Sequence, residues 1–231
     1  SKDNQSTPMR NLLDKKVVFI STSANHSAAI DIVGDLYLWG NNEKGQIGDG
    51  TKDNATKPIQ IGSDKKWKFV SVGSNDTMAI TVDGELYGWG ENGFGQLGLG
   101  HDDSVLTPTK VDNFNNVKSV SVGHSHTLAI ANGNKLYATG SNASYEIGDG
   151  GTSRISKFTK ITDREDWDIV KANHWTSSAK TKENDVYVWG YNANNVFPID
   201  EYHVKKPTKI SGKWNSMDIT GNMMVVNQGS K

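Results

Sequence analysis

The chain has 231 residues, of which 35% are hydrophobic and 24 are glycine. Its 25 basic and 26 acidic residues leave a formal net charge of −1, so no overall field exists to hold nucleic acid or an anionic membrane. The lack of cysteine excludes disulfides and thiolate metal sites, and no run of apolar residues is long enough to span a membrane as a helix. We expect a soluble protein. No signal-peptide pattern follows Ser1, and the sequence does not identify the compartment in which the protein works.

In chain order, the first unit contains four short runs with the composition of β-strands. They are a proline-led segment (8–12), an alternating run (18–22), a short apolar run (28–30) and an aromatic run (35–39). Such runs are rich in β-branched or aromatic residues and are bounded by Gly, Asn or Asp, which is a strand signal. In the next unit Asp83-Gly84 separates the apolar run from the aromatic run, which predicts a β-hairpin.

The same runs recur along the chain with a fixed period. The glycine after each aromatic run stands at Gly40, Gly90, Gly140 and Gly190, so the spacing is 50 residues. A period of this length is typical of an array of supersecondary units. We predict a single repeat domain over 1–231. Its units span about 8–39, 58–89, 108–139, 158–189 and 207–227, with glycine-rich loops between them.

The fifth unit is incomplete, because it ends at Asn227 before any aromatic run. Roughly four strands in each unit, and no amphipathic helix of useful length, are typical of β-propeller blades. The sequence therefore predicts an all-β fold: a propeller-like array of about five blades, four complete and the last truncated. An array that does not close leaves strand edges unpaired, a liability that proteins usually cover.

Two stretches within the units carry a family resemblance. They are 124–129, which reads His-Ser-His-Thr-Leu-Ala, and 95–98, which reads Gly-Gln-Leu-Gly. With the recurring Trp-Gly-x-Asn, the pattern resembles the repeat of the regulator of chromosome condensation from about Pro8 to Val226. The kelch repeat has a similar length but carries a paired-glycine signature that is missing here. The resemblance implies a seven-bladed ring, so three arrangements stay open: a smaller ring, an open arc, or a fragment of a longer propeller.

The loop after the aromatic run differs between units. In the first unit, 45–48 reads Gly-Gln-Ile-Gly. We expect these glycines to take positive φ, and we expect Gln46 to tie the loop to the backbone of a neighbouring unit. In the fourth unit, 195–198 reads Asn-Val-Phe-Pro. We predict that this loop does not adopt the same glycine-dependent turns.

Neither the histidines nor the Asp-Gly steps form a pattern typical of a metal site. The six histidines are spread over different units, and no set of three or four converges as zinc requires. Asp49-Gly50 lacks the ligand spacing of a calcium loop, and we interpret it as a turn. No nucleophile elbow, phosphate loop or dinucleotide fingerprint occurs. We therefore predict no catalytic residue, no metal, no cofactor and no enzymatic activity.

Four aromatic residues interrupt the repeat at loop positions, and they are the predicted contact residues for a partner: Trp175, Phe94, Tyr145 and Tyr191. Other units hold small or polar residues at these positions: Asn25, Lys44, Gly45 and Asn41 respectively. Aromatic residues on loops are typical of binding hot spots. The alternative is that each ring fills a local gap in the packing.

Lys15 and Lys65 lie 50 residues apart, so we expect them on the same rim of adjacent blades. The matching later positions are Asn115 and Glu165, so that rim runs from basic to acidic. Such a gradient can orient a charged partner, and we add both lysines to the predicted contact residues. A solvated charged rim is the alternative.

The sequence favours a non-catalytic module that binds and scaffolds proteins, with the loops on one face gripping a partner. The resemblance also implies guanine-nucleotide exchange factors for small GTPases, which insert a wedge into the nucleotide site; no added segment interrupts these units. A third hypothesis is a structural or decorating subunit of a large assembly such as a virus particle, and sugar binding is a further alternative. We predict protein partners, no nucleic acid or membrane, and self-association or assembly through the incomplete fifth unit.

Overall fold

The computed structural model describes residues 14–193, 195–220 and 223–228. Within these ranges the chain forms eighteen strands and no helix, and hence no helix that could cross a membrane. The strands form four four-stranded sheets and one two-stranded sheet, in which consecutive strands pair antiparallel. We call these sheets blades 1 to 5. The all-β prediction and the count of four complete blades and one truncated blade are confirmed.

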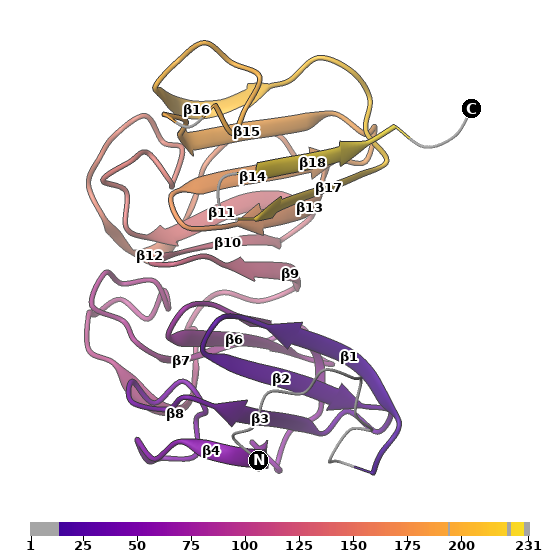
Figure 1. Ribbon diagram of the computed structural model, residues 1–231, viewed down its shortest axis with the longest axis vertical. Coiled ribbons are helices and arrows are strands. Elements are labelled where there is room, and N and C mark those ends of the chain that lie inside the picture. The colour runs from indigo at the N-terminus through magenta and orange to yellow at the C-terminus, as the bar shows by residue number, and fades with distance from the viewer. Residues whose placement is uncertain (1–13, 194, 221–222, 229–231) are drawn as a thin grey trace, which may run out of the picture.

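The blades follow one another in chain order, from β1–β8 in the lower part of Figure 1 to β9–β18 in the upper part. Blade 1 contains β1 (Val17–Thr22), β2 (His26–Asp31), β3 (Leu36–Gly40) and β4 (Ala55–Ile61). Blade 2 contains β5 (Trp67–Val72), β6 (Asp76–Thr81), β7 (Leu86–Gly90) and β8 (Val105–Lys110). Blade 3 contains β9 (Val117–Val122), β10 (His126–Ala131), β11 (Lys135–Gly140) and β12 (Ile155–Lys160). Blade 4 contains β13 (Trp167–Ala172), β14 (Thr176–Thr181), β15 (Val186–Tyr191) and β16 (His203–Lys209), and blade 5 contains β17 (Ser216–Thr220) and β18 (Met223–Asn227).

The blade boundaries are shifted by one strand from the sequence repeat. Each described proline-led segment, or its Phe158 counterpart, lies in the fourth strand of a blade and pairs with the aromatic strand before it, as Ile59 pairs with Leu38. The proline-led segment of the fifth unit therefore lies in β16 and completes blade 4. A proline fits this outer strand, where a ladder hydrogen bond need not be donated. The first such segment, 8–12, lies outside the described residues.

The hydrophobic core lies between consecutive blades. At the first junction, Leu38 and Ile47 of blade 1 pack with Trp67 and Trp89 of blade 2. The second strand of each complete blade is buried along almost its whole length. This burial explains the short apolar runs, and packing of each blade onto the next is what stabilises such an array.

Serine side chains join the innermost strands of consecutive blades. Ser21 Oγ accepts a hydrogen bond from the backbone N–H of Val72 at 3.1 Å. Ser71 and Ser121 repeat this contact at the next two junctions, with Val122 N and Ala172 N. The first strand of each of these blades is therefore fixed to the first strand of the next.

Histidines join the second strands at two of the junctions. His26 Nε2 lies 2.8 Å from Thr77 Oγ1, and His126 Nε2 lies 2.9 Å from Ser177 Oγ. Burial lowers the pKa of His26 to about 4 and, together with the nearby His124, that of His126 to about 3. Both rings are therefore neutral at pH 7 and act as hydrogen-bonded core residues.

Blade 2 carries an aspartate where blades 1 and 3 carry these histidines. Asp76 is fully buried, and within the described residues neither of its carboxylate oxygens has a hydrogen-bond partner of normal geometry. The same is true of Thr127 Oγ1, at the position equivalent to Thr77. Burial raises the pKa of Asp76 well above its usual range, and backbone N–H groups nearby offset this only in part. The junction between blades 2 and 3 therefore lacks one polar link.

A buried asparagine organises the long loop after each third strand. Asn42 Oδ1 accepts a hydrogen bond from Ile47 N at 2.9 Å, and Asn42 Nδ2 donates to Asp49 Oδ1 at 3.1 Å. The equivalent residues bind their own loops in the same way: Asn92, Asn142 and Asn192. The Asn of the Trp-Gly-x-Asn motif is therefore the residue that closes the loop.

The long loop of blade 1 is also attached to blade 2, through its main chain. The carbonyl oxygen of Gln46 accepts hydrogen bonds from Thr77 Oγ1 at 2.8 Å and from Trp89 Nε1 at 3.0 Å. The Gln46 side chain stays within its own loop, where it accepts from Lys44 N. The predicted link to the next unit exists, but the backbone of Gln46 makes it.

The loop of blade 4 keeps the first turn without glycine, so the prediction for 195–198 is wrong at Asn195, whereas Pro198, which stands where Gly48 takes a φ of +86°, is not among the residues with positive φ. Asn195 takes a φ of +52°, close to the +80° of Gly45, because asparagine tolerates the left-handed region. Asn195 N donates to Asn192 O at 2.9 Å, and Phe197 N donates to Asn192 Oδ1 at 2.8 Å. These two contacts have direct counterparts in blade 1.

Within the described residues, the array is open at both ends. Ile20 of β1 is 67% exposed, whereas Val70, at the same position in blade 2, is 1% exposed because blade 1 covers it. At the other end, Met223 and Val225 of β18 are also exposed. In the part of the chain that the structure describes, the five blades therefore do not close into a ring.

Candidate functional site

The strand directions separate the predicted contact residues onto two faces. Because paired strands run antiparallel, the hairpins after first strands and the long loops after third strands emerge on one face, which we call the loop face. The four aromatic candidates lie on or beside these loops. Lys15 and Lys65 directly precede first strands and therefore lie on the opposite face.

Three of the aromatic candidates belong to one continuous row of rings on the loop face, which we call the aromatic ridge. In order, its members are His124, His174, Trp175, Tyr191, Tyr202, His203 and Tyr145. The distances between consecutive ring centroids are 4.6, 5.3, 5.7, 5.4, 4.8 and 5.4 Å. The ridge runs from the inner hairpins of blades 3 and 4 to their outer loops.

The ridge is exposed and its rings support one another. Trp175 is 48% exposed and Tyr202 is 63% exposed. The Trp175 and Tyr191 rings meet edge to face at 76°, and the Tyr191 and Tyr202 rings at 83°, the arrangement that aromatic quadrupoles favour. Because each ring is held by its neighbours, little side-chain entropy is left to lose when a partner binds.

At its inner end the ridge is a stacked pair of imidazoles. The His124 and His174 rings are nearly parallel, at 4°, and His124 Nδ1 lies 2.8 Å from Ser74 Oγ of blade 2. Partial burial, and then the neighbouring His174, lower the pKa of His124. The His124 ring is therefore neutral at pH 7.

At its outer end the ridge contains a strained residue. Tyr145 takes a φ of +66° at the position where Gly45 and Gly95 take +80° and +76°. A side chain in this region costs about 1–2 kcal/mol. Lys205 Nζ lies 5.6 Å from the centroid of the Tyr145 ring, a cation–π contact. A bulky residue in a conformation suited to glycine is typical of functional sites.

Replacing Tyr145 by glycine is expected to leave the free energy of unfolding within about 1 kcal/mol of the unmodified protein, because relief of backbone strain offsets the lost ring contacts. Gly95→Ala provides the contrast. Its Cβ would lie 2.6 Å from Ser156 Cα, and we expect a loss of about 2 kcal/mol or more. Urea denaturation of both variants measures this difference. A large loss of stability in Tyr145→Gly would mean that the ring is needed for the fold.

Phe94 lies on the loop face in blade 2 and is 48% exposed. Its loop is held against blade 3, because Arg154 Nη1 donates a hydrogen bond to Gly93 O at 2.8 Å. Within the described part of the chain, the ring contacts of the ridge do not reach Phe94. It is a separate exposed aromatic residue on the same face.

The two lysines make contacts within their own blades. Lys15 Nζ contacts the Tyr37 hydroxyl and lies 3.2 Å from Asp31 Oδ2, and these groups raise the pKa of Lys15. Lys65 Nζ contacts Asp64 and lies 5.3 Å from the Tyr87 ring centroid. Both ammonium groups are therefore already paired on the face opposite the ridge.

Sequence reasoning missed four ridge residues: His124, His174, Tyr202 and His203. The first two had a usable signal, because they are 50 residues apart and so occupy the same position in adjacent blades. The other two did not. His203 meets Tyr191 because β15 and β16 pair at these residues, and the sequence does not give that register.

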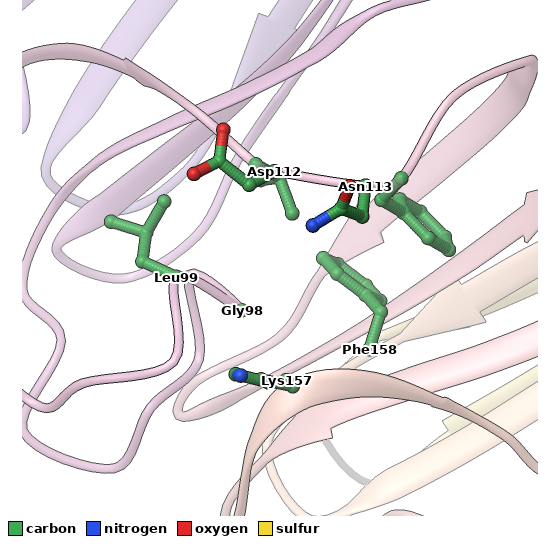
Figure 2. A pocket seen from close by; sticks show the side chains of 8 residues that line it. Gly98, Leu99, Asp112, Asn113, Lys157 and Phe158 are labelled. Atoms are coloured by element: carbon green, nitrogen blue, oxygen red, sulfur yellow. The ribbon is translucent and has the colours of Figure 1, made fainter.

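A separate cavity of about 400 Å³ lies at the outer edge of the junction between blades 2 and 3 (Figure 2). Its lining includes Leu99, Asp112, Lys157 and Phe158, and the Phe158 ring stacks on Phe114 with centroids 4.5 Å apart. Among the residues that the structure describes, no three His, Asp or Glu side chains converge to hold a metal ion. The ridge is therefore the stronger candidate site.

Two sequence models, both described as the regulator of chromosome condensation (RCC1) repeat, match this chain. One covers residues 33–80 and 83–130, and the other covers 67–96 and 117–146. Residues 33–146 of the chain carry repeats of the regulator of chromosome condensation family. The RCC1-repeat matches extend from blade 1 into the long loop of blade 3, and blade 4 repeats the same strand order.

Solved structures show the same fold. Human WBSCR16 is 19% identical with a TM-score of 0.86, over 96% of this chain and 60% of that one. Prp20p from Saccharomyces cerevisiae, described with its binding properties to Gsp1p and histones, is 24% identical with a TM-score of 0.77, over 90% and 54%. Yeast RCC1 (Prp20) bound to Kap60 is 23% identical with a TM-score of 0.76, over 95% and 54%. This RCC1-repeat chain therefore spans 54% to 60% of the length of these proteins.

Proposed function

We propose that this chain is a non-catalytic binding and scaffolding module that grips a protein partner with the aromatic ridge, and that its five units act as one repeat domain. The ridge itself carries this proposal: seven rings from two adjacent blades lie in unbroken contact on an exposed face. Tryptophan and tyrosine are the residues that most often dominate the binding energy of protein interfaces.

The geometry of the ridge favours a protein over a sugar. A sugar ring stacks flat on an aromatic face, whereas the Trp175, Tyr191 and Tyr202 rings stand edge to face and offer no coplanar platform. Apolar ring surface next to hydroxyl and imidazole groups is typical of the centre of a protein interface. A protein partner also agrees with the binding of Kap60 by yeast Prp20.

The proposal treats the remaining candidates as secondary contacts. Phe94 lies on the loop face and would extend the interface onto blade 2. Lys15 and Lys65 lie on the opposite face, so they would meet a different, charged partner and not the protein held by the ridge.

Photo-crosslinking tests which face holds the partner. A photoreactive phenylalanine analogue at Trp175 is expected to capture a protein from the source cells, and the same analogue at Ile32 is not. Ile32 is a matched control because it is 58% exposed in a β2–β3 turn on the opposite face. Equal capture of the same protein from both positions would contradict the proposal.

Once the captured protein is identified, its affinity for the unmodified chain is compared with its affinity for a ridge variant. This variant carries, at three ridge positions, the residues that other units hold there. Trp175→Ser, Tyr191→Ser and Tyr145→Gly use the residues that this chain itself holds at Ser125, Ser141 and Gly95. We expect the combined variant to bind about 100-fold more weakly. Unchanged affinity in a folded variant would exclude the ridge as the binding surface.

A further inference from the structure

The cavity between blades 2 and 3 takes no part in the aromatic ridge (Figure 2). It measures about 400 Å³, which lies within the range of small-molecule sites, about 300–1,000 Å³. Three segments form its walls: the long loop of blade 2 at 98–99, the turn between β8 and β9 at 111–114, and β12 at 157–158. The cavity therefore lies in the middle of the described array and takes its lining from two adjacent blades.

An aromatic wall lines this cavity because blade 3 departs from the repeat at two positions. In blade 2, Trp89 of the third strand packs over the preceding long loop, where a Cβ on Gly48 would lie 2.6 Å from its Nε1. Blade 3 has Thr139 in place of this tryptophan. The ring that covers Gly98 is instead Phe158, whose Cδ2 would lie 2.5 Å from a Cβ there. The aromatic ring at this junction therefore comes from the outer strand of blade 3.

Two more side chains extend the apolar part of the lining. The Phe158 ring stacks on Phe114 at an angle of 7°, with the centroids 4.5 Å apart. Leu99 stands where blades 1 and 3 have Asp49 and Asp149, each of which accepts a hydrogen bond from the asparagine of its own loop. Leucine makes no such bond, and its side chain lines the cavity. Figure 2 shows Leu99 on one side of the cavity and Phe158 on the other.

Two opposite charges stand at the rim of the cavity. Asp112 and Lys157 are exposed, and Figure 2 shows them on opposite sides of the cavity. Within the described residues neither of them makes an ion pair. Lys110 is close enough to be influenced by the charge of Asp112, but its ammonium group is hydrogen-bonded to Glu85. Both charges of the rim are therefore available to a ligand.

We propose that this cavity binds a small zwitterion with an apolar side chain, namely a free α-amino acid such as phenylalanine. The carboxylate of the ligand pairs with Lys157, its ammonium group pairs with Asp112, and its side chain lies between Leu99 and Phe158. A ligand with a single charge would leave either Asp112 or Lys157 without a partner, so the two rim charges select for a zwitterion. The site is separate from the aromatic ridge, and the proposal does not depend on the function of the ridge.

Titration of the whole chain with L-phenylalanine tests the proposal, with the NMR shifts of the backbone amides of 98–99, 112–113 and 157–158 as the readout. We expect saturable binding with a dissociation constant of about 1 mM, because exposed ion pairs each contribute little. Two analogues remove one charge each: 3-phenylpropionate lacks the ammonium group, and phenethylamine lacks the carboxylate. Both are expected to bind about threefold more weakly or worse. Glycine, which has both charges and no side chain, is expected to show no saturation in the same range.

Two substitutions assign each charge of the ligand to its partner. Asp112→Asn is expected to weaken the binding of L-phenylalanine about threefold and to leave that of 3-phenylpropionate unchanged. Lys157→Gln is expected to weaken the binding of L-phenylalanine by a similar factor and to leave that of phenethylamine unchanged. Asp53→Asn and Lys57→Gln are the matched controls, because they remove exposed charges in blade 1, and both should bind L-phenylalanine as the unmodified chain does. All four residues are exposed, so the variants are expected to fold.

Several results would overturn the proposal. One is the absence of saturable shifts up to about ten times the expected dissociation constant. Another is equal affinity for L-phenylalanine and its two singly charged analogues, and a third is unchanged affinity in both Asp112→Asn and Lys157→Gln. Saturable shifts confined to 174–175 and 202–203 would also overturn it, because they would place the ligand on the aromatic ridge.

Discussion

Replacing Asp76 by histidine is expected to raise the free energy of unfolding by about 2 kcal/mol. The substitution removes a buried carboxylate that lacks a hydrogen-bond partner of normal geometry, and it provides a ring nitrogen for Thr127 Oγ1, as His26 does for Thr77. The site has room for the ring, because His126 already packs beside Gly123 as Asp76 packs beside Gly73. Urea denaturation at pH 7 measures the gain.

The reciprocal variant His26→Asp is the control, and it should lose a comparable free energy of unfolding at the first junction. If both variants change the free energy of unfolding in the same direction, a histidine at this position does not stabilise the junction relative to an aspartate. Asp76→Asn separates the contribution of the charge from that of the missing hydrogen bond.

The contribution of Asp76 depends on pH with a definite sign. Its folded-state pKa is raised, so the folded protein binds this proton more tightly than the unfolded chain, whose aspartate pKa is about 3.9. Stability from this group is therefore greatest below pH 3.9 and falls as the pH rises toward the folded pKa. The difference in free energy of unfolding between Asp76→Asn and the unmodified protein should grow as the pH rises from 3.9 toward the folded-state pKa. Above that pKa the difference should stay constant. A constant advantage from pH 4 to pH 8 would contradict this.

Asn142→Asp is expected to cost about 3 kcal/mol although it changes only an NH₂ group to an oxygen. Asn142 Nδ2 donates to Asp149 Oδ1 at 3.0 Å and to Gly151 O at 2.9 Å. The substitution would set a carboxylate oxygen against these two acceptors in a buried site. The loop that carries Tyr145 would then detach from blade 4.

Hydrogen exchange of Ile147 N, which donates to Asn142 Oδ1, reports opening of this loop directly. Glu43→Gln, an exposed substitution in the equivalent loop of blade 1, is the control and should change stability by less than about 0.5 kcal/mol. Unchanged protection of Ile147 in Asn142→Asp would show that the asparagine does not close the loop.

The fold was predictable because its determinants recur. A period of 50 residues, strands with alternating or aromatic composition and the Asp83-Gly84 turn are local signals that reinforce one another. The boundary of each blade was not predictable in the same way. Whether the strand with Pro58 pairs with β3 or β5 depends on long-range contacts, and the sequence repeat is equally consistent with both.

The aromatic ridge was predictable only where it broke the repeat. Trp175, Tyr145 and Tyr191 stand out against small or polar residues in other units. Trp175 and Tyr191 meet within blade 4, whereas Tyr145 joins the ridge through His203 only because blade 3 packs on blade 4, which no local pattern encodes. For Lys15 and Lys65 the repeat predicted the location but not the contacts. Their spacing of 50 residues placed both on one rim, but it did not predict that Asp31 and Asp64 pair with them.

The polar gap at Asp76 has a consequence for how the array moves. The junction between blades 2 and 3 also has Thr139 in place of the tryptophan found in blades 1, 2 and 4, and it contains the cavity of about 400 Å³. In a repeat array each junction contributes its own share of the stability. The junction between blades 2 and 3 lacks a polar link and an indole contact that the junction between blades 1 and 2 has, so we expect its share of the stability to be smaller than that of the first junction. Any opening of this junction would move Phe94 away from the aromatic ridge.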